Sequence, residues 1–160
     1  MIFVTIGTQE PFDRLIKIMD EFASEISEEV IAQVFNNSYR VRHMKTLGFL
    51  DPLEYNTLFT EARLIVSHAG MGTIISALTK NKPIIVLPRI AKLGEHRNEH
   101  QLDTIYKLKE LGYIRIANNE IELKTMLYDI IKQPDIKPLH QIEKYASEEL
   151  ITSLHQFISI

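Results

Sequence analysis

The chain has 160 residues, of which 45% are hydrophobic and 24% are charged, and its formal net charge is -3. This composition predicts one globular domain with a full core, and the net charge gives no general attraction to nucleic acid. The sequence has no apolar run near the roughly 20 residues that span a bilayer, no basic leader and no cysteine. We therefore expect a cytoplasmic protein without a signal peptide, a disulfide or a thiolate metal site.

Strands and helices alternate in the first part of the chain. The turn after the first apolar run is Gly7-Thr8-Gln9-Glu10-Pro11, and Asp51-Pro52 has the form of an N-cap followed by proline at the first helical position. The expected elements are a strand at 2–6, a helix at 12–24, a strand at 30–35, a half-buried extended segment at 41–50 and a helix at 53–62.

The stretch 62–88, ARLIVSHAGMGTIISALTKNKPIIVLP, contains the central motif of the chain. The β-branched run Leu64–Val66 predicts a buried parallel strand, which ends in a turn of small residues. A helical apolar pattern follows as far as Pro83, and 84–87 is the next buried strand. A strand, a turn, a helix and a second strand form the βαβ unit of an open α/β sheet.

The remaining elements complete one doubly wound, Rossmann-like α/β domain with an open, mostly parallel sheet. A helix is expected at 97–111, ended by Gly112, then a strand at 113–117 and a helix at 120–133 that turns Ile121 and Leu123 inward. A tail helix at 138–159 carries an apolar stripe that suits either its own domain or a partner. We expect residues 1–160 to form a single domain.

The turn after the strand Leu64–Val66 is a candidate anion site. A helix that begins at the carboxyl end of a strand presents free backbone N–H groups and the positive end of its dipole. Gly70 and Gly72 allow close approach of the backbone, and His68 and Thr73 add side-chain donors. Position 75 is Ile, so the turn differs from the dinucleotide fingerprint and NAD is not expected.

A second polar cluster, Gly94-Glu95-His96-Arg97-Asn98-Glu99-His100-Gln101, follows the strand 84–87. Ligands of open α/β sheets bind beyond the carboxyl ends of the strands, and His, Asn and Gln side chains match sugar hydroxyls. The same letters also fit H-x-x-E-H, in which two histidines bind zinc and the glutamate acts as a base. A zinc hydrolase is therefore a rival interpretation of this cluster.

Four ordered motifs resemble a known family: VTIGTQEPFDRLI at 4–16, LGFLDPL at 47–53, VSHAGMGTIISALTKNKPIIVLPR at 66–89 and GEHRNEHQ at 94–101. They are similar to the C-terminal, nucleotide-sugar-binding half of GT-B glycosyltransferases of the family that includes MurG. The resemblance extends to stand-alone versions of that half. These are the small catalytic subunit of the UDP-GlcNAc transferase of N-glycan assembly, and PssE-type subunits of bacterial capsule and exopolysaccharide synthesis, which fit best.

The resemblance implies that the turn after the central strand holds a diphosphate. Backbone donors would come from Gly70, Met71, Gly72 and Thr73, with His68 close by. In many members of the family a glutamate binds the ribose hydroxyls, and this chain has Ser76 at that position. A serine hydroxyl still forms a hydrogen bond with ribose, although a weaker one than a carboxylate forms.

The resemblance also implies contacts with the base and the sugar of a UDP-sugar, which is a substrate; no cofactor is expected. Leu50 would lie against uracil, and His100 and Gln101 would bind the sugar hydroxyls with His96 near them. Gly7-Thr8 would border the cleft on the side of a partner subunit.

A GT-B site lies between two halves, and this chain supplies one of them. The resemblance implies a membrane-associated PssD-type partner that brings the lipid-linked acceptor and carries the general base. The chain would then act at the inner face of the membrane as the donor-binding subunit of an inverting hexosyltransferase. The absence of a DxD-type carboxylate pair near the phosphate turn fits an inverting displacement without metal. A subunit that only binds and stabilises its partner is the alternative.

Overall fold

The computed structural model describes residues 1–8, 10–95 and 100–143 and, beyond them, 145, 147–149, 152 and 155–156. For residues 100–102 it describes the backbone alone. All statements below refer to these residues.

Six parallel strands form one sheet in the order β3-β2-β1-β4-β5-β6. The chain therefore builds the sheet outward from β1 in one direction and then, after a crossover, outward from β4 in the other. This is the doubly wound order of Rossmann-like domains, and the predicted fold class is confirmed. The strands are β1 (Ile2–Thr5), β2 (Val30–Gln33), β3 (Lys45–Leu47), β4 (Leu64–His68), β5 (Ile84–Leu87) and β6 (Arg115–Ile116).

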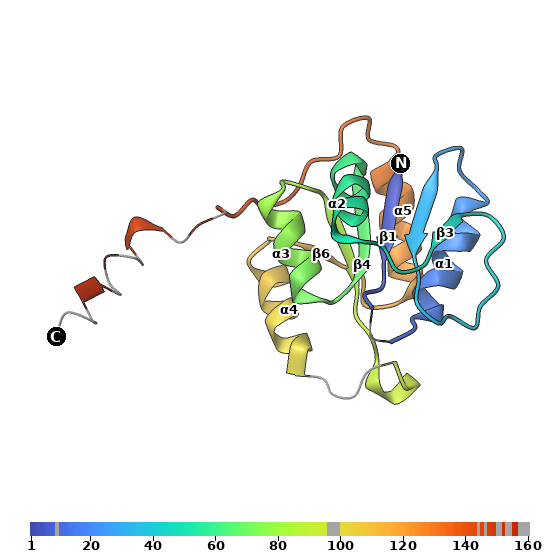
Figure 1. The fold of residues 1–160 in the computed structure, drawn as a ribbon, viewed down its shortest axis with the longest axis horizontal. Coiled ribbons are helices and arrows are strands. Elements are labelled where there is room, and N and C mark those ends of the chain that lie inside the picture. Colours follow the sequence, from blue (N-terminus) through green and yellow to red (C-terminus); the bar gives the residue numbers. More distant parts are fainter. Residues whose placement is uncertain are drawn as a thin grey trace.

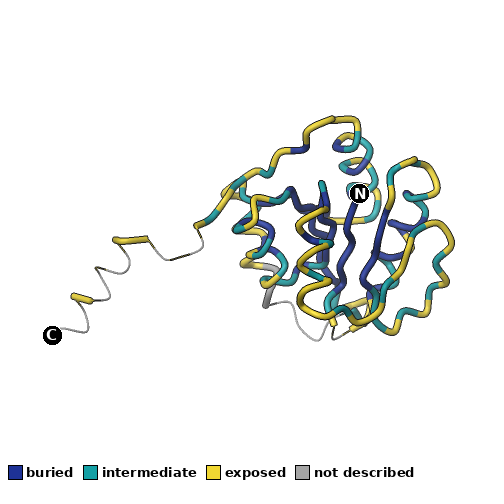
Figure 2. Tube along the Cα trace, turned by 45° about the horizontal axis from the view of Figure 1, so that its top comes forward, coloured by how far each residue is buried: buried dark blue, intermediate teal, exposed yellow. Residues whose placement is uncertain are grey.

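Helices cover both faces of the sheet (Figure 1). On one face, α1 (Asp13–Ala23) and α5 (Glu120–Ile131) bury Leu15, Phe22 and Leu123 against the side chains of alternate strand residues. The opposite face is covered by α2 (Pro52–Glu61), α3 (Met71–Thr79) and α4 (His100–Glu110). The central strands lie between these layers and are buried along their length (Figure 2), as expected for parallel strands.

The extended segment that the sequence predicts at 41–50 contributes a strand of three residues only, β3. The reason is the carboxylate of Asp20, which is fully buried on α1. It accepts hydrogen bonds from the backbone N–H groups of Arg42, His43 and Met44 at 2.7–3.2 Å. These groups are thereby used by a side chain, so pairing with β2 begins only at Lys45.

The predicted tail helix does not begin at 138. Residues 138–143 are non-helical and run back across the domain: the N–H of Ile142 donates to the carbonyl oxygen of Leu78, and the His140 ring stacks on Tyr113 at 3.7 Å. These contacts hold the segment against the domain in place of a helical turn. The prediction for the rest of the tail falls mostly outside the described residues. Those described from 145 onward are exposed, and 148–149, 152 and 155–156 are helical.

Two further expectations are corrected. Ile121 is 80% exposed, because Leu123, Leu127 and Ile130 form the buried side of α5. The last strand is limited to Arg115–Ile116 rather than 113–117. Among the described helices, none combines the length and the apolar character of a membrane-spanning segment.

Candidate functional site

The candidate site lies where the order of the strands reverses, between β1 and β4. Thr5, the last residue of β1, is in register with Ser67 near the end of β4. From these ends the chain leaves toward opposite faces, to α1 after β1 and to α3 after β4. The carboxyl ends of the two strands therefore lie at the switch point of the sheet, which is the position at which open α/β sheets bind ligands.

Buried polar side chains hold the turn after β1. The hydroxyl of Thr5 donates to Gln33 Oε1 at 2.9 Å, and Gln33 Nε2 donates to the carbonyl oxygen of Gly7 at 3.1 Å. Gly7 has a φ of 77°, a left-handed conformation that glycine adopts without a steric penalty. Gln33 on β2 thus holds the turn in place through these two hydrogen bonds. Thr8, the next residue after Gly7, is exposed.

The imidazole of His68 lies between two of the predicted glycines. A Cβ atom added at Gly7 would be 3.0 Å from His68 Cε1, and one added at Gly70 would be 2.4 Å from His68 Nε2. His68 Nδ1 is 3.5 Å from the carbonyl oxygen of Thr5. Gly7 and Gly70 therefore allow the backbone to approach the ring of His68 closely. The approach of Gly70 to an anion stays a prediction.

The first turn of α3 is open to a ligand. Its N-cap, Gly70, provides no side-chain hydrogen bond, and the turn contains no acidic residue. The other helices with a described N-terminus differ: α2 has the capping box of Asp51 and Glu54, α5 is capped by Asn119, and α1 carries Asp13 in its first turn. The positive end of the α3 dipole is consequently available to an external anion.

Several of the predicted residues gather around this turn. The imidazole ring of His68 lies against both Gly7 and Gly70. The helix α3 begins with Met71, Gly72 and Thr73. Apart from its chain neighbours and the α3 backbone, no atom of the described residues lies within 4 Å of a Cβ added at Gly72. Ser76 is half-buried one turn further on, on the side of the helix that also carries Gly72 and Thr73.

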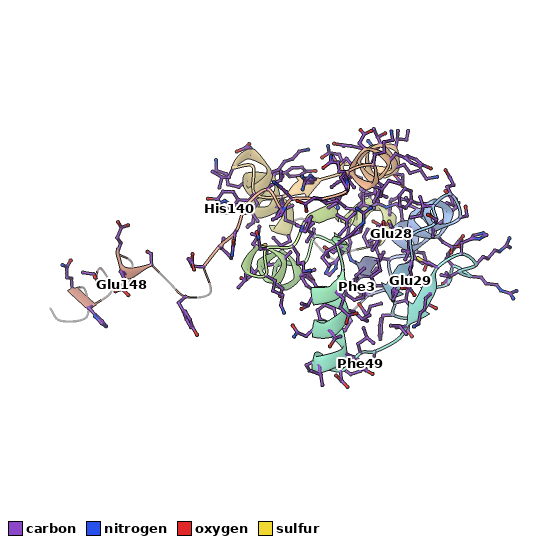
Figure 3. All side chains as sticks on the ribbon, turned by 90° about the horizontal axis from the view of Figure 1, so that it is seen from above. Phe3, Glu28, Glu29, Phe49, His140 and Glu148 are labelled. Carbon is purple, nitrogen blue, oxygen red and sulfur yellow. The ribbon has the colours of Figure 1, made fainter. Side chains whose placement is uncertain are left out.

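Of the other predicted residues, Leu50 follows β3, and two lie at the start of α4. Leu50 is partly buried against the core cluster to which α3 contributes, whereas its neighbour Phe49 is 81% exposed and points away from the domain (Figure 3). His100 and Gln101 begin α4, and their side chains are not described. His96 lies outside the described residues, as does most of the H-x-x-E-H motif. The described residues contain no group of three potential metal ligands.

Three charged residues that the sequence did not single out as site residues connect the loops after β1 and β5. Arg14 forms a two-point ion pair with Glu95 at 2.8 Å, and the buried guanidinium of Arg89 donates to backbone carbonyl groups of both loops. Burial lowers the pKa of Arg89, while Glu95 and Glu10 act in the opposite direction. The side chain nonetheless remains charged, because an arginine pKa lies so far above neutrality.

The comparison with protein families identifies the class of protein. Residues 1–150 match the glycosyltransferase family 28 C-terminal domain, and the chain belongs to this family. The match includes β1, the turn at His68 and the loop after β5.

Several relatives are described as UDP-N-acetylglucosamine transferase subunit ALG13. The protein of Eremothecium gossypii is 36% identical over 94 residues, which are 58% of this chain and 46% of the relative. That of Saccharomyces cerevisiae is 24% identical over 155 residues, with 71% of this chain and 75% of the relative covered. The chain thus spans less than half the length of the Eremothecium protein.

Solved structures share the fold. A solution NMR structure of ALG13 aligns with a TM-score of 0.58 and 21% identity over 96% of this chain and 93% of the other. MurG of Acinetobacter baumannii aligns with a TM-score of 0.56 and 14% identity over 82% of this chain and 41% of the other. The chain therefore has the architecture of one half of a GT-B enzyme.

Proposed function

We propose that this chain is the donor-binding subunit of a two-component inverting glycosyltransferase that uses a UDP-sugar. The observation that supports this function most directly is the uncapped first turn of α3, which lies beside His68 at the switch point of the sheet. A nucleoside diphosphate is an anion of the kind that such a helix N-terminus stabilises. Membership of a glycosyltransferase family makes a sugar nucleotide the natural candidate.

The proposed contribution to catalysis is electrostatic. When the glycosidic bond to the donor breaks, negative charge develops on the departing UDP. Met71, Gly72 and Thr73 form the first turn of α3, where backbone N–H groups have no partner within the helix, and these groups would stabilise that charge without rearrangement. The rigid turn would also orient the sugar for attack from the opposite side, as inversion requires.

The acceptor and the general base are assigned to a partner subunit. The structure corresponds to one half of a GT-B enzyme, whose site lies between two halves. A membrane-associated partner of PssD type would supply a lipid-linked acceptor, so that the chain acts at the inner face of the membrane without spanning it. The names of the relatives favour UDP-GlcNAc as donor, whereas the motifs at 4–16 and 94–101 favour capsule or exopolysaccharide synthesis.

A second candidate is a subunit that binds and stabilises its partner without binding a donor. Ser76 favours it, because a serine on α3 forms a weaker hydrogen bond with ribose than the glutamate of many family members forms. Both candidates predict a complex with the partner, so formation of the complex does not separate them.

A transfer assay separates the two candidates. The chain would be purified with its acceptor-binding partner and supplied with labelled UDP-glucose, UDP-galactose or UDP-GlcNAc and the lipid-linked acceptor. Transfer from one donor that depends on both subunits would support the donor-binding role. Transfer by the partner alone at the same rate would leave the chain as a stabilising subunit.

A further inference from the structure

Arg89, which follows β5, is buried among backbone carbonyl groups from distant segments. It is 7% exposed. Its Nη2 donates to the carbonyl oxygens of Ile6 at 2.9 Å and Glu10 at 2.8 Å, and its Nη1 donates to those of Pro11 at 2.6 Å and Glu95 at 3.2 Å. Three of these acceptors belong to the loop after β1, and the fourth belongs to the loop after β5.

An ion pair holds the loop after β5 against α1, the helix that follows the loop after β1. Arg14 on α1 donates from Nε and Nη2 to the two carboxylate oxygens of Glu95, each at 2.8 Å, and Nη2 also donates to the carbonyl oxygen of Pro88 at 2.7 Å. Glu95 Oε2 accepts the N–H of Ile90 at 2.8 Å. Glu95 thus binds α1 through its side chain and Arg89 through its carbonyl oxygen.

The geometry of this contact requires arginine. A guanidinium has five donors in one rigid plane, so its two terminal nitrogens reach four carbonyl groups that surround that plane. The guanidinium carbon of Arg89 also lies 4.5 Å from the ring centroid of Phe12, at the start of α1. A lysine has one donor nitrogen at the end of a flexible stem and would leave several of these carbonyl groups without their present partner, including the buried one of Ile6.

We infer that Arg89 is a positioning residue that makes the loop after β1 and residues 88–95 a single rigid unit beside the α3 turn. The loop after β1 includes Gly7, which lies against His68. The loop after β5 leads to His100 and Gln101 at the start of α4. Arg89 therefore links the loop beside the proposed phosphate position to the segment that leads to the proposed sugar position. This part of the inference rests on the proposed function.

Hydrogen exchange of the wild-type chain tests the rigid unit without any ligand. Exchange would be followed by mass spectrometry at increasing urea concentrations. We expect the backbone amides of 6–12 and 88–95 to share one opening free energy, because breaking the Arg89 contacts releases both loops. Opening free energies that differ between the loops and respond differently to urea would overturn the inference.

Arg89→Lys and Arg63→Lys form a matched pair of variants. Arg63 has the same chemistry at the opposite edge of the sheet: Nη1 and Nη2 donate to the carbonyl oxygens of Gln133 and Ile131, and Nε donates to Glu28. Arg89→Lys should accelerate exchange at both 6–12 and 88–95, whereas Arg63→Lys should leave both loops unchanged. If Arg63→Lys and Arg89→Lys change the exchange of these loops to the same extent, Arg89 has no specific role in holding the two loops together, and the inference is overturned.

Calorimetric titration with UDP and a UDP-sugar adds the functional measurement. Arg89→Lys should weaken binding of the UDP-sugar about 10-fold to 100-fold, as a displaced positioning group does, and Arg63→Lys should bind as the wild type does. Unchanged affinity in Arg89→Lys together with faster loop exchange would show that the rigid unit does not serve the donor. If the wild-type chain binds neither ligand, the proposed function fails, and the exchange experiment alone decides whether the rigid unit exists.

Discussion

The imidazole of His68 occupies the space that side chains at Gly7 and Gly70 would need. An alanine Cβ at position 70 would lie 2.4 Å from His68 Nε2, and the ring is confined on its other side by Gly7. We expect Gly70→Ala to lower the free energy of unfolding in urea by about 1–3 kcal/mol, the usual cost of overpacking. Gly72→Ala is the control and should cause no loss, because apart from its chain neighbours and the α3 backbone no described atom lies within 4 Å of a Cβ added there.

The same contact can be tested by a double-mutant cycle. Removing the imidazole by His68→Ala vacates the space that the new methyl group needs. Gly70→Ala should then cost much less in the His68→Ala background than in the wild type. A full cost in both backgrounds would mean that the backbone conformation, and not His68, excludes a side chain at position 70.

Asp20 supports the loop that precedes β3. Burial by itself raises the pKa of its carboxyl group, but hydrogen bonds from the N–H groups of His43, Arg42 and Met44 and from the Tyr39 hydroxyl together hold that pKa below 3.8. We expect Asp20→Asn to lower the free energy of unfolding at neutral pH by about 2 kcal/mol, because charge-assisted hydrogen bonds are lost. Asp13→Asn on the same helix should cost less, because among the described backbone N–H groups only that of Ser38 donates to the half-buried carboxylate of Asp13.

The pH dependence of this effect follows from the direction of the pKa shift. A carboxyl group whose pKa is lower in the folded chain stabilises the fold fully above its unfolded pKa and loses that contribution as the pH falls through its folded pKa. Urea unfolding at several pH values should therefore show that the difference between wild type and Asp20→Asn narrows below about pH 4. A difference that stays constant on acidification would contradict the assigned role of Asp20.

At the scale of elements, α2 begins at a capping box that the sequence predicted only in part. Asp51 accepts the N–H groups of Leu53 and Glu54, and the carboxylate of Glu54 accepts the N–H of Asp51. Asp51→Ala should lower the free energy of unfolding by about 1 kcal/mol. Glu54→Gln keeps an acceptor at the same place and should cost little; an equal loss in both variants would argue against the box.

The regular elements were predictable because each depends on local pattern. Short β-branched runs such as 64–66 and 84–87 produced buried strands, and helical apolar spacing identified α1 and α5. Local pattern failed to predict the bounds of an element where a side chain or backbone group remote in sequence binds that segment. β3 is short because Asp20 takes three N–H groups, and residues 138–143 are non-helical where Ile142 and His140 contact α3 and Tyr113.

At the scale of the whole molecule, the position of the candidate site in the fold could be predicted from the sequence, but the contacts between its residues could not. The rule that ligands bind beyond the carboxyl ends of parallel strands placed the turn at 67–73 correctly at the edge of the sheet. The contact of Gly70 with His68 could not be predicted, because it depends on a ring orientation. The connection of Arg89 to the loop after β1 joins residues far apart in sequence, which no local motif indicates.

The central claim is that the first turn of α3 binds the diphosphate of a sugar nucleotide. Its most direct test is calorimetric titration of the wild-type chain and of Gly72→Val with UDP. The Cβ of a valine at position 72 has space among the described residues, since apart from its chain neighbours and the α3 backbone no described atom lies within 4 Å of it, but the methyl groups would occupy the position proposed for phosphate. Thr79→Val places the same side chain at the other end of α3 and is the control.

We predict that the wild-type chain and Thr79→Val bind UDP with equal affinity and that Gly72→Val loses binding while its melting temperature stays within a few degrees (about 1 kcal/mol) of the wild type. Equal UDP affinity in Gly72→Val and the wild type would contradict the account, because the phosphate would then bind elsewhere.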